Sequence, residues 1–82
     1  MSTSVHPRPK IAAQAMRVWF DEHMLHVELR DGREIAVPLD WFPNLRDASP
    51  SQRDAWRLIG GGVGISWEEL DEDLSVARLL TT

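Results

Sequence analysis

The chain of 82 residues contains no cysteine, and Lys10 is its only lysine. Without cysteine the chain can form neither a disulfide framework nor a thiolate metal site, and this fits a reducing compartment. No apolar run approaches the roughly 20 residues that span a bilayer, and the first ten residues lack the apolar stretch of a signal peptide. We therefore expect a cytoplasmic protein with no membrane contact.

Positive charge is also scarce. Thirteen acidic residues stand against nine basic ones, which gives a formal net charge of -4. Proteins that bind nucleic acid directly show the opposite balance, because clustered lysine and arginine supply most of their affinity. The composition therefore argues against direct nucleic-acid binding and favours a basic protein as the partner.

The chain is long enough for one domain only. Residues 1–14 combine serine, threonine and a Pro-x-Pro spacing at Pro7 and Pro9 with little to bury, so we expect a flexible tail. A proline-rich docking peptide is the alternative for this segment. Residues 15–82 are then the single folded domain.

Apolar and polar residues alternate with period two over residues 16–20 and again over 25–30, which predicts two strands. Asp31-Gly32 follows, and this pair favours a type I′ hairpin turn because glycine and aspartate tolerate positive φ. Residues 34–37 predict a third strand, which Pro38 ends. The result is a three-stranded antiparallel meander whose inward residues are Val18, Phe20, Leu25, Val27, Leu29, Ile35 and Val37.

A helix start is expected at Ser49, since serine as cap, Pro50 at the first position and Gln52 three residues after the cap form a capping box. We expect this main helix to run to about Ile59. The three glycines 60–62 are then expected to end it, because glycine takes the left-handed conformation at little cost. Its buried stripe is predicted to be Ala55, Trp56 and Ile59.

Shorter elements complete the predicted fold. Asp40 is expected to cap a single helical turn over residues 41–45, with Trp41 and Phe42 closing one edge of the core. Residues 63–67 are predicted to add a fourth strand to the meander, and residues 75–80 to form a last capped turn. The predicted class is α+β, with a three- to four-stranded antiparallel sheet, one main helix and short C-terminal helical turns.

An acidic stretch follows the predicted fourth strand. Ile65, Trp67, Leu70 and Leu74 are expected to anchor this stretch on the core while the acids between them face water. These acids could form an ordinary solvated face with no binding role. Alternatively, they could form a fixed surface that binds a basic partner. The candidate partner-binding acids are Glu68, Glu69, Asp71, Glu72 and Asp73.

Sites for catalysis, metals or phosphate are not predicted. His23 and His26 are spaced to point to opposite faces of a strand, so they do not form a metal pair. The glycine run 60–64 lacks the Gly-Lys-Ser/Thr end of a phosphate loop, and the acid run 71–73 lacks the central glycine of a calcium loop. No nucleophile stands beside a base, so we predict no catalytic residue, no metal, no cofactor and no enzymatic activity.

Four tryptophans occur in the chain. Trp56 and Trp67 stand on apolar stripes and are expected in the core. Trp19 falls on the polar face of its strand, where it is either an exposed anchor for a partner or covered by a helix. We include Trp19 among the candidate partner-binding residues.

Several segments carry a resemblance to a known family. They include Leu25–Gly32, Val37–Leu45, Gln52–Arg53 with Trp56, and above all the acidic block within Ile65–Val76, followed by Leu79–Leu80. Together they span about residues 16 to 80 and resemble the bacterial domain-of-unknown-function family 2442. Glu68 departs from the proline that commonly follows the tryptophan in this family.

The resemblance implies a small α+β domain with no established catalytic residues. It also implies a frequent genomic setting beside another small protein, in what looks like a toxin and antitoxin arrangement. Similar small acidic folds occur among phage-borne inhibitors of bacterial defence systems. These expectations come from the resemblance alone.

The leading functional hypothesis is a non-enzymatic, antitoxin-like module that inhibits or regulates a basic, nucleic-acid-handling protein through the acidic stretch. The first alternative is a phage anti-CRISPR or DNA-mimic inhibitor of a bacterial defence complex. The second is a self-associating structural module, since an edge strand or the Trp19 face could pair with a second copy. We expect a monomer or a weak homodimer.

Overall fold

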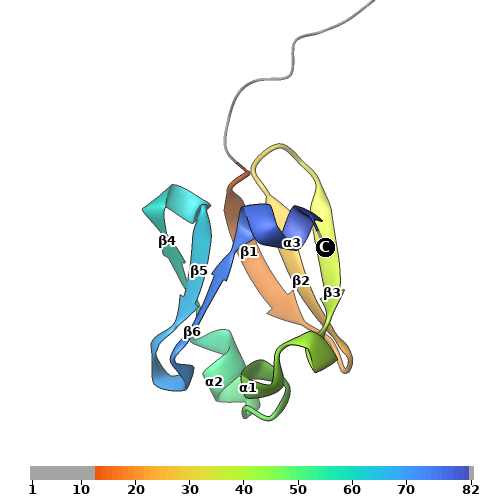
Figure 1. Cartoon of the computed structure of the whole chain (residues 1–82), viewed down its shortest axis with the longest axis vertical. Coiled ribbons are helices and arrows are strands. Elements are labelled where there is room, and N and C mark those ends of the chain that lie inside the picture. The colour runs from red at the N-terminus through yellow and green to blue at the C-terminus, as the bar shows by residue number, and fades with distance from the viewer. Residues whose placement is uncertain (1–12, 82) are drawn as a thin grey trace, which may run out of the picture.

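The computed structural model describes residues 13–81, which form two small antiparallel sheets and short helices, an α+β arrangement (Figure 1). The predicted tail lies outside the described residues, apart from Ala13 and Gln14. No helix among residues 13–81 is long and apolar enough to cross a membrane.

The first sheet is the predicted meander. Its strands β1 (Ala15–Phe20), β2 (Met24–Leu29) and β3 (Glu34–Pro38) pair antiparallel in the order β1-β2-β3. Val27 on the central strand pairs with Val18 on one side and with Ile35 on the other, as the alternation predicts. The inward residues of β2 are fully buried, so this face of the sheet supplies half of the core.

The turn between β2 and β3 is a hairpin, but the type I′ prediction is wrong. Gly32 has φ of +94°, whereas Asp31 is not in the left-handed region that type I′ requires at both central residues. The amide of Gly32 instead donates to the carbonyl of Leu29 at 3.1 Å. The Asp31 carboxylate accepts from the amide of Arg33 at 3.0 Å, which stabilises the longer loop.

The second sheet was not predicted. Strands β4 (Arg57–Ile59), β5 (Gly64–Trp67) and β6 (Glu72–Ser75) pair antiparallel in the order β4-β5-β6. The predicted fourth strand therefore exists as β5, but it is the centre of a separate sheet and does not extend the meander. Part of the acidic stretch is itself a strand, β6.

The predicted main helix is also shorter than expected. Its start is confirmed, because Ser49 Oγ accepts from the amide of Gln52 at 3.2 Å and Gln52 Oε1 accepts from the amide of Ser49 at 2.9 Å. The helix α2 (Pro50–Asp54) then ends after five residues. Residues 57–59, predicted as its last turn, pair with β5 instead, because that pairing connects them to the core through Leu58 and Ile65.

The three glycines do not end a helix. They form the tight connection from β4 to β5, and all three have positive φ. A Cβ on Gly62 would lie 2.4 Å from the carbonyl oxygen of Ala15, so only glycine allows β1 and this connection to approach each other. The run therefore joins the two sheets at one corner.

The remaining short elements connect the two sheets. A 3-10 turn (Leu39–Trp41) leads into α1 (Pro43–Arg46), and Asp40 lies inside that turn and does not cap it, contrary to the prediction. Phe42 packs against the core as expected, but Trp41 is 52% exposed. The predicted last turn is α3 (Val76–Thr81), which contacts both β3 and β6.

One hydrophobic core lies between the two sheets. The largest fully buried side chain is Trp67, as predicted, whereas Trp56, which was expected in the core, is half-buried and packs against its edge. Ala55 and Ile59, expected in the stripe of the helix, are exposed. The buried core residues are Ala15, Val18, Leu25, Val27, Leu29, Val37, Leu39, Leu45, Ile65, Trp67, Leu74, Val76 and Leu79.

Candidate functional site: the acidic hairpin

The candidate site is the hairpin formed by β5, the 3-10 turn Glu68–Leu70, Asp71 and β6, which we call the acidic hairpin. Its base is fixed by Trp67, which is 1% exposed. The indole Nε1 of Trp67 donates to the main-chain carbonyl of Arg53 at 2.9 Å, and its ring meets Phe20 edge-on at a centroid distance of 6.2 Å. The polar end of this tryptophan is therefore satisfied inside the core.

The turn of the hairpin directs the acids outward. Asp71 is the one non-glycine residue of the described chain with positive φ (52°), a conformation that aspartate tolerates better than most residues. Across the turn, Trp67 pairs with Glu72 and Ser66 with Asp73. Buried and outward positions alternate along β6, so Leu74 enters the core while Asp73 stays exposed. The expected anchoring is thus present, except that Leu70 is only half-buried.

Three of the five acids have partners within the chain. Glu68 forms an ion pair with Arg57. Glu69 accepts from Gln52 Nε2 at 2.7 Å, and Glu72 accepts from Asn44 Nδ2 at 3.1 Å. Amide donors orient a carboxylate without neutralising it, so only Glu68 has its charge offset.

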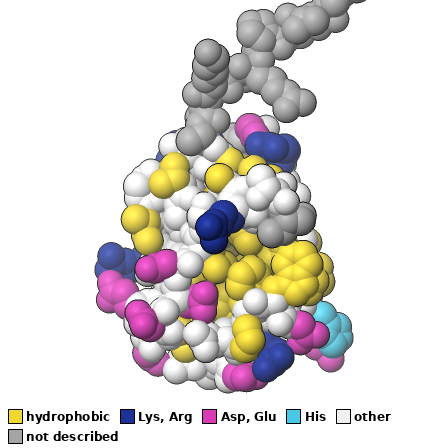
Figure 2. Space-filling view, viewed as in Figure 1, with side chains coloured by type: hydrophobic (Ala, Val, Ile, Leu, Met, Phe, Trp, Pro, Cys, Tyr) yellow, Lys and Arg dark blue, Asp and Glu magenta, His cyan; other side chains and the backbone are white. Residues whose placement is uncertain are grey.

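The other two acids, Asp71 and Asp73, are exposed and form no ion pair or side-chain hydrogen bond within residues 13–81. Arg53, a possible internal counter-charge, points elsewhere and donates to the carbonyl oxygens of Leu45 and Arg46. The hairpin therefore keeps most of its negative charge, and Figure 2 shows acidic side chains gathered over this part of the molecule.

Trp19 lies apart from the acidic hairpin. It is on β1, on the opposite face from Phe20, which is the ring that contacts Trp67. Its ring stacks on His26 with centroids 5.3 Å apart and planes 5° apart, and the guanidinium of Arg17 lies 4.4 Å from its centroid. Trp19 is half-buried and lies on the face of β1 opposite the ring that contacts Trp67, so the structure does not bring it together with the five acids.

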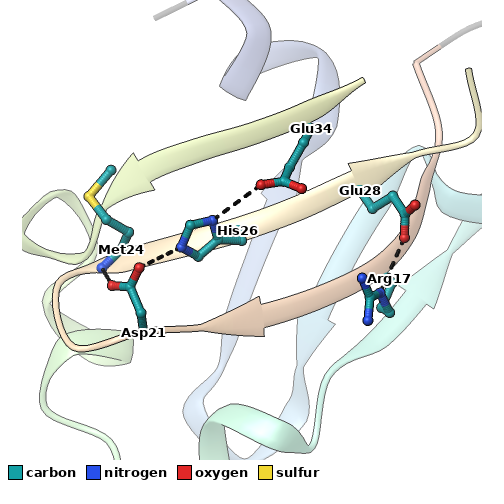
Figure 3. Close-up of polar contacts among 6 residues, drawn as sticks. All are labelled: Arg17, Asp21, Met24, His26, Glu28 and Glu34. Carbon is teal, nitrogen blue, oxygen red and sulfur yellow. Dashed lines mark hydrogen bonds and ion pairs between the residues drawn. The ribbon is translucent and has the colours of Figure 1, made fainter. Parts of the chain in front are cut away.

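A polar cluster surrounds His26, for which the sequence predicted no role beyond excluding a metal pair with His23. His26 Nε2 lies 2.6 Å from Asp21 Oδ2, and Nδ1 lies 3.7 Å from Glu34 Oε1 (Figure 3). The hydrogen bond with His26, followed by the amides of His23 and Met24, lowers the pKa of Asp21 to about 2. The strand alternation already places Asp21, His26 and Glu34 on one face, and that signal could have identified the cluster.

An open groove of about 450 Å³ lies between the end of β1 and α2, lined by Phe20, Asp21, Glu22, Pro50, Arg53 and Asp54. The five acids of the hairpin do not line it. Its most perturbed carboxyl, Asp21, has a lowered pKa, whereas a general acid at neutral pH needs a raised one. Among residues 13–81 no group of three or more histidine or acidic side chains is arranged to hold a metal ion.

Fold and surface together define a small α+β domain with an acidic hairpin anchored on the core by Trp67. The chain belongs to the family described as proteins of unknown function, DUF2442, which it matches over residues 15–82. A crystal structure of a protein of unknown function from Rhodospirillum rubrum ATCC 11170 is similar, with 32% sequence identity and a TM-score of 0.72, and covers 84% of this chain and 86% of that one. No curated protein matches the chain.

Proposed function

We propose that this protein is a non-enzymatic binding module that captures a basic, nucleic-acid-handling protein on the acidic hairpin and thereby inhibits or regulates it. The observation that carries the proposal is the exposure of Asp71 and Asp73 without internal counter-charges, next to a buried Trp67. Acidic surfaces held in a fixed geometry meet basic grooves with fast, salt-sensitive association.

The hydrogen bonds that hold two of the acids support the proposal as well as the charge does. Glu69 and Glu72 are held by side chains from the α1 and α2 region, namely Gln52 and Asn44. A preorganised surface loses little side-chain entropy on binding, so its charges contribute more to affinity than mobile ones would. Trp19 belongs to another face and is not required for this contact.

The test compares capture by the wild type with capture by the double variant Asp71→Asn, Asp73→Asn. Asparagine removes the charge but tolerates the left-handed backbone at Asp71, so folding should be preserved. The immobilised full chain is exposed to lysate at low and at high salt. We expect the wild type to retain a basic protein at low salt. The amount retained should fall at least ten-fold in the variant, and also for the wild type at high salt, which corresponds to a loss of roughly 1.4 kcal/mol of binding free energy.

The matched control is the double variant Glu22→Gln, Asp40→Asn, which removes the same charge from two exposed carboxylates outside the hairpin. It should capture the partner like the wild type. Equal capture by the hairpin variant and the wild type, or equal loss in both variants, would reject the hairpin as the contact. The identity of the captured protein distinguishes an antitoxin-like role from inhibition of a bacterial defence complex.

Self-association is the second candidate, because Ile59, the last residue of the edge strand β4, is 43% exposed, and Val63, which follows the glycine run, is 41% exposed. An uncovered edge strand can pair with the same strand of a second copy. Light scattering over a concentration series tests this, since a constant monomer mass would exclude it.

A further inference from the structure

His26 lies between two carboxylates that come from its two neighbouring strands. Asp21 follows β1, His26 is on β2 and Glu34 begins β3, and Figure 3 shows all three side chains on the outer face of the first sheet. The His26 side chain is only 17% exposed. Its Nδ1 atom is buried and has no hydrogen-bond partner, although Glu34 Oε1 lies 3.7 Å away.

The geometry suits a ring that carries protons on both nitrogens. A neutral imidazole has one N–H and one lone pair. If the proton is on Nε2, toward Asp21 at 2.6 Å, the buried lone pair of Nδ1 faces the Glu34 carboxylate. If it is on Nδ1, a lone pair faces Asp21 at that short distance. Only the imidazolium presents a donor to each carboxylate.

Among residues 13–81, no other charged group around the His26 ring offers a donor to Asp21 or Glu34 in place of the imidazolium. Arg17 and Glu28, in the next row of the same face, pair with each other at 3.2 Å. Glu22 and His23, in the turn before β2, pair with each other at 3.7 Å and are both highly exposed. The stacked indole of Trp19 is neutral, and its face attracts a cation more than a neutral ring.

We propose that His26 is a proton-dependent clamp across the first sheet, which holds Asp21 and Glu34 together as the imidazolium and releases Glu34 when it loses a proton. Glu34 is the carboxylate released because Asp21 is held independently. Asp21 Oδ1 accepts from the amides of His23 and Met24, both at 2.8 Å, whereas the Glu34 side chain is 57% exposed. Loss of the proton therefore removes this polar contact between β2 and the edge strand β3, while the ladder between the two strands remains.

The direct test is a pH titration of the full chain by NMR, observing the carboxyl carbon of Glu34 and the ring of His26. We expect the Glu34 signal to show a step that coincides with the loss of the His26 ring proton. That step should vanish in His26→Gln and persist in His23→Gln, which removes the exposed histidine. The clamp is overturned if the Glu34 signal shows no step at the pH where the His26 ring loses its proton. It is also overturned if that step disappears in His23→Gln.

A stability measurement keeps the proposal testable if His26→Gln does not fold. The clamp requires the carboxylate of Glu34 as well as the imidazolium of His26, so Glu34→Gln removes it at every pH. The thermal unfolding midpoint should therefore fall between acidic and mildly alkaline pH by about 2 °C more in the wild type than in Glu34→Gln. The control Glu28→Gln, on the same face, should behave like the wild type. Equal falls in the wild type and Glu34→Gln overturn the proposal.

Discussion

The side chain of Trp67 is hydrogen-bonded to the main chain of Arg53. The indole of Trp67 donates to the carbonyl of Arg53, while the guanidinium of Arg53 donates to the carbonyls of Leu45 and Arg46 near the end of α1. One arginine thus connects the acidic hairpin to both helices at that end of the molecule. The position of the hairpin depends on this connection.

Replacement of Trp67 by phenylalanine should destabilise the protein by about 2–3 kcal/mol. The change leaves a cavity in the core and a part-buried carbonyl of Arg53 without its donor. The free energy of unfolding, measured in urea, gives the loss directly. The control Trp56→Phe, at a half-buried position, should cost only about 1 kcal/mol. Similar losses at the two positions would contradict the role assigned to Trp67.

Two glycines should respond differently to alanine, although both have positive φ. Gly62→Ala places a Cβ 2.4 Å from the carbonyl oxygen of Ala15, where the backbone has no room to move. Gly32→Ala meets nothing within 4 Å and incurs only the conformational cost. We expect a loss of about 1–2 kcal/mol at Gly32 and of more than about 3 kcal/mol at Gly62.

Denaturant unfolding of both variants beside the wild type measures the difference. Gly62→Ala should also show weaker hydrogen-exchange protection at the start of β1, because the new side chain pushes against Ala15. If the two variants were equally stable, the close approach of β1 to the glycine run would be disproved.

Acid should destabilise the protein through Asp21. The pKa of this carboxyl is about 2 in the folded chain, against 3.8 for the ordinary group, chiefly because of the hydrogen bond with His26. A folded pKa below the unfolded one means that the carboxylate stabilises the fold above pH 3.8, and that this contribution is lost as the pH falls toward about 2. We expect a smaller acid loss of stability in Asp21→Asn.

Urea unfolding at a series of pH values between about 5 and about 2 provides this comparison. The exposed carboxylate Asp40, replaced by asparagine, serves as the control and should leave the wild-type acid loss in place. An unchanged acid loss in Asp21→Asn would show that the Asp21 carboxylate does not stabilise the fold through a lowered pKa.

Local patterns predicted the first sheet and the start of α2. The alternation along β1 and β2 and the capping box at Ser49 involve residues that are close in sequence, so neighbouring residues suffice to specify them. The second sheet depends on pairing between β4, β5 and β6, of which β4 has three residues and no distinguishing pattern. A continuous helix was therefore predicted where the chain in fact changes to a strand.

The candidate site was predictable to a similar degree. Burial of Trp67 and exposure of the following acids follow from the apolar spacing of residues 65–74. The partners of those acids could not be predicted, because Asn44, Gln52 and Arg57 come from elements that reach the hairpin only through tertiary packing. Only the structure separates Asp71 and Asp73 from the acids that have internal partners.

The position of α3 affects how the protein unfolds. The helix lies against β3 of one sheet and β6 of the other, and Val76 and Leu79 enter the core that the sheets share. A three-stranded sheet stripped of its covering layer keeps little stability of its own. If α3 detaches, neither sheet should therefore stay folded alone. We expect the two sheets to unfold cooperatively in a single transition.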